Sequence, residues 1–142
     1  MRNLCVLVAA ALVAACSMPV SVERAAAMTD AEICGDYGDL VRDFRRWDAV
    51  NWQPGTFATG APAFAPLVAE IKRRELVSSS AFASFARGEV GDGMTETELL
   101  CTLGRPKSVA GNEWIFDTYS GPYRAGERTI EVRDGRVTAI EH

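Results

Sequence analysis

Apolar positions in the first half of the chain recur every three to four residues, the period of an amphipathic helix. Thr29 and Glu32 have the spacing of a capping box and predict that a helix begins there. We expect Gly35 and Gly38 to interrupt it, after which the helical pattern returns and continues to Trp47. The chain should therefore begin its folded part with two helical pieces.

Two more helices are predicted after a connection rich in glycine, proline and alanine, residues 51–66. Pro66 suits the first turn of the next helix, because a helix needs no N–H donor at that position. Residues 78–80 are all serine and break the pattern, and a further short helix ends at Gly88. These signals together predict a helical region over residues 29–88.

A short helix with a full set of boundary signals comes next. Thr95 and Glu98 form a second capping box, Gly104 offers a left-handed C-terminal cap, and Pro106 prevents continuation. The helix has an apolar face within about a third of its circumference. This face consists of Leu99, Leu100 and Leu103.

Beyond this helix the hydrophobic period drops to two, which is typical of strands. Trp114 lies in one such strand, and Asp134-Gly135 is a strong signal for a type I′ hairpin between two others. A two-residue turn sets the expected pairs Val132 with Val137 and Ile130 with Ala139. The expected fold is α+β, with N-terminal helices followed by a short helix packed on a three-stranded antiparallel sheet.

The extreme N-terminus is apolar from Leu4 to Ala15 and follows a single cation. About a dozen residues are too few to span a bilayer but suit the hydrophobic region of a signal peptide; a buried core helix is the alternative. The residues before Cys16 resemble a bacterial lipobox, which predicts a lipoprotein signal peptide over residues 1–15, cut before Cys16, and a tether over residues 16–28. Ordinary cleavage after Ala27 is the alternative.

Four cysteines raise the question of a disulfide bond. If Cys5 leaves with the signal peptide and Cys16 carries lipid, Cys34 and Cys101 remain as an even pair in an oxidising compartment. Cys101 lies on the side of its helix opposite the leucines and needs cover from the N-terminal half. A Cys34–Cys101 bridge is the hypothesis, and two buried free thiols are the alternative.

Charge and residue content exclude several classes of function. The formal net charge of −4 gives no electrostatic basis for binding nucleic acid. The one histidine is the final residue, His142, and no two cysteines have the spacing of a metal site. We therefore expect no enzyme activity, no cofactor and no metal.

Two kinds of surface residue are candidates for contacts. Two basic clusters could approach lipid head groups, although a solvated helix face is the simpler interpretation; they are Arg42 with Arg45-Arg46, and Lys72-Arg73-Arg74. Tyr119 and Tyr123 flank a Gly-Pro turn in what reads as an exposed loop. Because aromatic side chains often anchor interfaces, this pair is the expected partner contact.

Several of these features together resemble the SmpA/OmlA family, the BamE-like outer-membrane lipoproteins. The resemblance covers the region 89–142 and follows a lipobox, as in that family. The residues that carry it are Gly93, Met94, Thr95, Leu103, Gly104, Pro106, Trp114 and Gly135. Members of the family carry a short extended segment before this motif, whereas this chain carries the helical region 29–88.

The resemblance implies a non-catalytic lipoprotein on the periplasmic side of the outer membrane. Its partners would be envelope proteins and, through the lipid anchor, the membrane itself, in outer-membrane assembly or maintenance. The same small fold also occurs in soluble periplasmic or secreted binding and inhibitor proteins, which is the alternative function. Fold analogy by itself cannot decide between them.

Overall fold

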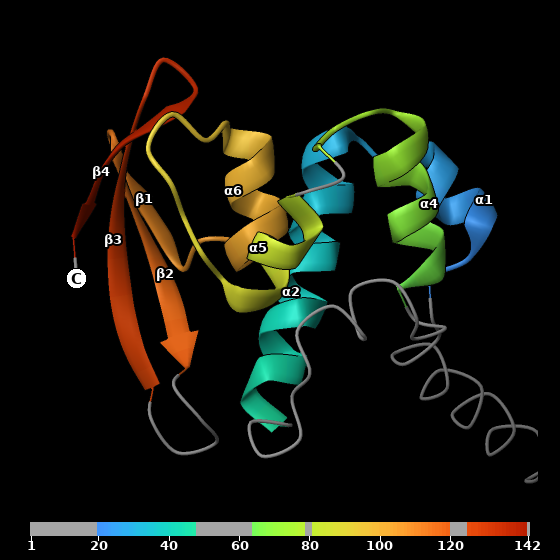
Figure 1. Ribbon diagram of the computed structural model, residues 1–142, viewed down its shortest axis with the longest axis horizontal. Coiled ribbons are helices and arrows are strands. Elements are labelled where there is room, and N and C mark those ends of the chain that lie inside the picture. Colours follow the sequence, from blue (N-terminus) through green and yellow to red (C-terminus); the bar gives the residue numbers. More distant parts are fainter. Residues whose placement is uncertain (1–19, 48–63, 79–80, 120–124, 142) are drawn as a thin grey trace, which may run out of the picture.

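The computed structural model describes residues 20–47, 64–78, 81–119 and 125–141. These residues form an α+β fold in which helices cover one face of an antiparallel sheet with strand order β1-β2-β3-β4 (Figure 1). The helices are α1 (Val22–Ala27), α2 (Asp30–Trp47), α4 (Ala65–Arg73), α5 (Ala81–Arg87) and α6 (Glu96–Leu103). The strands are β1 (Ser108–Ala110), β2 (Glu113–Tyr119), β3 (Ala125–Arg133) and β4 (Arg136–Glu141).

The elements lie in successive layers. Figure 1 shows the sheet on one side, α5 and α6 next to it, α2 in the middle, and α4 with α1 on the far side. Among the residues described, no helix combines the length and apolar character needed to cross a membrane.

The sheet has four strands, so the expected three-stranded sheet is wrong in number. The additional strand is β1, which pairs with β2 through Ser108↔Ile115, Val109↔Trp114 and Ala110↔Glu113. All three residues of β1 are exposed, and Val109 is among the most exposed large hydrophobic side chains. A three-residue edge strand without a buried face shows no apolar alternation, which is the signal that strand prediction needs.

The α2 helix begins at its predicted capping box. The Thr29 backbone N–H donates to Glu32 Oε2 at 2.7 Å, and the Glu32 N–H donates to Thr29 Oγ1 at 3.3 Å. The expected interruption at Gly35 and Gly38 is wrong, because α2 runs unbroken through both. Gly38 instead allows close packing, since a Cβ atom there would lie 2.1 Å from the carbonyl oxygen of Leu100 in α6.

The predicted tether over residues 16–28 is wrong in its second half. Ser21 caps α1 by accepting the Arg24 backbone N–H at 3.2 Å, and Ala25 is fully buried against the rest of the helical layer. The apolar side of α1 is a short alanine run, which gives no strong helical period. Residues 16–19 lie outside the described part of the chain.

The next two helices agree with their boundary signals. Pro66 lies in the first turn of α4, and Gly88 ends α5 with a positive φ of 66°. Most of the predicted connection over residues 51–66, and Ser79 and Ser80 of the predicted break, lie outside the described residues.

Two hydrophobic clusters form the core. The first joins the helices α1, α2, α4 and α5 and includes Cys101 of α6. The second confirms that α6 lies on the sheet, and its buried members are Leu99, Leu103, Phe116, Ile130, Val132 and Val137. Leu100 was expected on the sheet-facing side but packs against the first cluster, so α6 has two apolar faces.

The β3–β4 hairpin has the predicted turn but not the full predicted register. Asp134 and Gly135 have φ values of 51° and 73°, as a type I′ turn requires, and Val132 pairs with Val137. Ile130 pairs with Ile140 rather than with Ala139, because a β-bulge lies between Glu131 and Val132. The bulge therefore brings the larger side chain of Ile140 to the covered face.

Candidate functional site

The predicted disulfide bond between Cys34 and Cys101 is present. It joins α2 to α6 across 67 positions of sequence, and both cysteines are fully buried. The bond therefore fixes the predicted helical region 29–88 to the predicted region 89–142, and the two regions share the first hydrophobic cluster.

The residues that carry the family resemblance have structural roles. Thr95 and Glu98 form the capping box of α6, with the Thr95 N–H donating to Glu98 Oε2 at 2.9 Å. Gly93 has a φ of 78°, and its N–H donates to the Val137 carbonyl of β4, while the Val137 N–H donates to the Met94 carbonyl. Trp114 is half-buried beside Phe116, with ring centroids 6.3 Å apart.

Gly104 ends α6 in a conformation that differs from the prediction. Its φ of 79° is positive as expected, but its ψ of −160° lies in the extended region open almost only to glycine, outside the left-handed helical region. A Cβ atom there would come within 2.2 Å of Asp39 Oδ1. Two constraints, backbone conformation and contact with α2, therefore both require glycine.

A polar contact missed by the sequence reasoning lies beside Gly104. The Arg105 backbone N–H donates to Asp39 Oδ1 at 2.9 Å, and its guanidinium Nη1 donates to Asp39 Oδ2 at 2.7 Å. The same guanidinium also pairs with Asp36. Arg105 therefore adds charged contacts to the disulfide bond between α2 and the end of α6, and Pro106 follows it directly.

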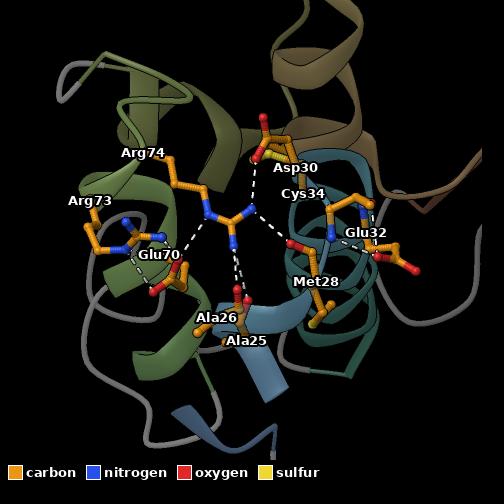
Figure 2. A network of polar contacts seen from close by, with 11 residues as sticks. Ala25, Ala26, Met28, Asp30, Glu32, Cys34, Glu70, Arg73 and Arg74 are labelled. Carbon is orange, nitrogen blue, oxygen red and sulfur yellow. Dashed lines mark hydrogen bonds and ion pairs between the residues drawn. A yellow bond between two sulfur atoms is a disulfide. The ribbon is translucent and has the colours of Figure 1, made fainter. Parts of the chain in front are cut away.

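In the basic cluster Lys72-Arg73-Arg74, the Arg74 side chain binds groups inside the fold, whereas the other two side chains are exposed. Figure 2 shows Arg74 turned inward, between α4 and the junction of α1 with α2. Its guanidinium donates to the Met28 carbonyl at 2.8 Å, to Asp30 at 2.9 Å and to Glu70 at 2.9 Å. It also donates to the last carbonyls of α1, Ala25 at 3.4 Å and Ala26 at 3.0 Å, which carry the negative end of the helix dipole.

Glu70 is the carboxylate shared by this network. Hydrogen bonds from Arg73, and with them those from Arg74, hold the pKa of Glu70 below the usual value of a glutamate side chain. Because the folded pKa is the lower one, these ion pairs stabilise the fold above the ordinary pKa, and this contribution is lost as the pH falls through the folded value.

Replacing Arg74 by alanine should detach α1 from α4. The substitution removes every contact of the guanidinium with the carbonyls of α1, and we expect the amides of α1 to exchange with solvent roughly tenfold faster. Arg73→Ala is the matched control, because Arg73 is 63% exposed and its guanidinium binds Glu70 on its own helix and no carbonyl of α1 among the described residues. Hydrogen exchange measured by mass spectrometry checks this, and equal protection of α1 in both variants would refute the role of Arg74.

The other basic cluster places one arginine at a cavity. Arg42 of α2 pairs with Asp39 at 3.1 Å, while the side chains of Arg45 and Arg46 lie outside the described part. The cavity has a volume of about 180 Å³ and lies between the sheet and the helices. Its lining includes Arg42, Arg87 at the end of α5, Leu103 at the end of α6, and Thr118 and Arg128 of the sheet.

Arg128 is the unusual member of this cavity. It pairs with Phe116 across β2 and β3 and therefore lies on the face of the sheet that the helices cover. Its Nη1 donates to the Gly88 carbonyl at a long 3.4 Å, and its Nε is buried without a hydrogen-bond partner. Burial lowers the pKa of Arg128 from its ordinary value. The cavity was not predicted from the sequence, because its arginines come from three separate elements.

The remaining predicted site residues are only partly described. Tyr119 was expected in a loop, but it is the last residue of β2 and pairs with Ala125. Cys16 and Tyr123 lie outside the described residues. Within the ranges described, no group of three or more His, Cys, Asp or Glu side chains is placed to hold a metal ion.

The chain was also compared with known proteins. No family model, curated protein or solved structure matches it.

Proposed function

We propose that this protein is a non-catalytic lipoprotein of the bacterial envelope, acylated at Cys16, which binds other envelope proteins on the periplasmic side of the outer membrane. Its role would lie in outer-membrane assembly or maintenance. The observation that carries the proposal is the buried Cys34–Cys101 disulfide bond. Disulfide bonds persist in oxidising compartments outside the cytosol and are rare inside it.

The position of α1 supports cleavage before Cys16 over cleavage after Ala27. Cleavage after Ala27 would remove the whole of α1, including the buried Ala25 and the carbonyls that Arg74 binds. It would leave the Arg74 guanidinium without those acceptors. Cleavage before Cys16 keeps α1 intact.

A lipid at Cys16 would also define which end of the protein faces the membrane. Five peptide units separate Cys16 from the cap of α1 at Ser21 and span at most about 18 Å. The α1 and α4 layer would therefore lie next to the head groups. The exposed, positively charged side chains of Lys72 and Arg73 on α4 would attract anionic lipids there. The Arg74 side chain would not take part, because it binds groups within the protein.

The alternative is a soluble periplasmic or secreted binding or inhibitor protein, and the disulfide bond is equally compatible with it. In either case Tyr119 and Tyr123 remain the proposed contact with a protein partner. A pull-down from solubilised envelope with the double Tyr119→Ala, Tyr123→Ala variant tests that contact.

Metabolic labelling with palmitate separates the two functions. We expect the wild-type protein to incorporate label and Cys16→Ala to lose it completely, because the thiol is the acylated atom. Cys5→Ala is the control and should keep the label, since Cys5 lies within the proposed signal peptide. Unlabelled wild-type protein, with a mature N-terminus beyond Cys16, would refute the lipoprotein and favour the soluble alternative.

A further inference from the structure

The cavity beside Arg128 is built from positively charged side chains in a chain whose net charge is −4. Three arginines from different elements line it: Arg42 of α2, Arg87 of α5 and Arg128 of β3. Among the described residues that line the cavity, Asp117 is the one acidic residue, and because side chains alternate along β2 it projects from the face of the sheet opposite Phe116. Its carboxylate is 3.7 Å from Lys107 Nζ there. The charge of Asp117 is therefore directed away from the cavity.

Two of the three guanidinium groups are already paired. Arg87 binds Glu89 through two hydrogen bonds of 2.6 and 2.8 Å, and Arg42 pairs with Asp39 at 3.1 Å. Arg128 forms no ion pair with any residue that the structure describes, and within that part of the chain its side chain makes one hydrogen bond, the long one to Gly88. The uncompensated charge of the cavity therefore belongs to Arg128.

Packing does not explain an arginine at this position. The neighbouring inward positions on β2 and β3 are Phe116 and Ile130, both fully buried, and an apolar side chain would complete this face at lower cost. A charged group on a covered face without a partner carries a desolvation penalty, which an anionic ligand would offset.

The neighbours of Arg128 leave room for such a ligand. Thr118 lines the cavity and pairs with Gly126, the next inward position on β3, where a Cβ atom would lie 3.2 Å from the Thr118 hydroxyl oxygen. Leu103 closes the apolar side at the end of α6. The cavity thus combines a charged donor, a hydroxyl and an apolar wall.

We propose that this cavity is a binding site for a phosphate group, with Arg128 as its principal ligand and Thr118, Arg42 and Arg87 around it. A planar carboxylate is satisfied by one guanidinium fork, whereas a tetrahedral phosphate can accept from donors that converge from several directions. The arrangement of three arginines on three elements fits the second case. This proposal does not depend on acylation at Cys16.

Isothermal titration of the purified protein with inorganic phosphate tests the site. We expect one site per chain with a dissociation constant below about 1 mM, and binding about tenfold to hundredfold weaker in Arg128→Gln. Arg133→Gln is the matched control, because Arg133 is exposed on the same strand and pairs with Glu131 at 2.7 Å. The control should bind phosphate as the wild type does.

Two further measurements complete the test. One identifies the ligand, and the other shows that a loss of binding in a variant does not come from misfolding. Glycerophosphoglycerol presents the phosphate as a lipid head group does. If it binds more tightly than inorganic phosphate, the site is assigned to a head group. If inorganic phosphate binds more tightly, the site is assigned to free phosphate. Phosphate should shift the backbone amide signals of Gly88 and Thr118 in the wild-type protein, whatever the variants do. Acetate binding as tightly as phosphate, unchanged binding in Arg128→Gln, or no shift at these amides would overturn the proposal.

Discussion

Replacing both Cys34 and Cys101 by alanine should lower the free energy of unfolding by about 4 kcal/mol. The bond closes a loop across 67 positions, and without it the unfolded chain regains the entropy of that loop. Since domains of this kind are stable by only about 5 to 15 kcal/mol, a loss of this size should be visible as a large shift in a urea unfolding curve.

Reduction of the wild-type protein supplies the control for this experiment. The reduced protein should unfold near the same urea concentration as the double alanine variant, because both lack the same covalent link. If oxidised and reduced wild-type protein unfold at the same urea concentration, the bond contributes nothing and the account of the α2–α6 junction is wrong.

Gly38→Ala should destabilise the protein by about 3 kcal/mol, the second large effect. The added Cβ would lie 2.1 Å from the Leu100 carbonyl oxygen and 2.4 Å from the Gly104 backbone nitrogen. Backbone atoms cannot move aside as a side-chain tip can, so α2 and α6 would have to separate. That separation would also strain the disulfide bond and the Arg105 contacts at the same junction.

Gly35→Ala is the matched control, one helical turn away in α2. The three atoms nearest to its Cβ would all belong to the flexible side chain of Arg105, the nearest at 3.2 Å, and alanine is the better helix former by about 1 kcal/mol. Gly35→Ala should therefore be neutral or stabilising. Thermal unfolding of both variants provides the measurement, and equal losses would show that the close approach of α6 to Gly38 is not what makes Gly38→Ala destabilising.

The sequence correctly predicted the features that depend on residues close together in the chain. Both capping boxes, at Thr29 and Thr95, and the turn at Asp134-Gly135 occur as expected, because each depends on residues within a few positions. The pairing of Cys34 with Cys101 was also correct, since the residues facing away from the leucines of α6 needed cover.

The predictions about local structure that were wrong failed because of contacts between distant parts of the chain. Gly35 and Gly38 suggested a helix end because glycine is a poor helix former, but the approach of α6 requires glycine at position 38 within a continuous helix. The bulge after Glu131 moved the hairpin register by one residue, and no residue at that point marks a bulge. The strand β1 has no buried face from which to be recognised.

The cavity beside Arg128 was not predicted from the sequence, because it too depends on contacts between distant segments of the chain. Arg42, Arg87 and Arg128 are widely separated in the chain and meet only when α2, α5 and β3 pack. One clue was available: Arg128 alternates in phase with Ile130 and Val132, so the strand pattern itself put a charge on the covered face. A charged residue in phase with core positions is a signal for a binding or paired site.

Peptide mass spectrometry of the unreduced protein, with free thiols alkylated as the cells are opened, tests the central claim most directly. The claim is that an oxidising compartment joins the helical layer to the α6 and sheet unit through one covalent bond. We predict a linked peptide pair containing Cys34 and Cys101. Recovery of both residues in alkylated form would contradict the claim and, with it, the export on which the proposed function depends.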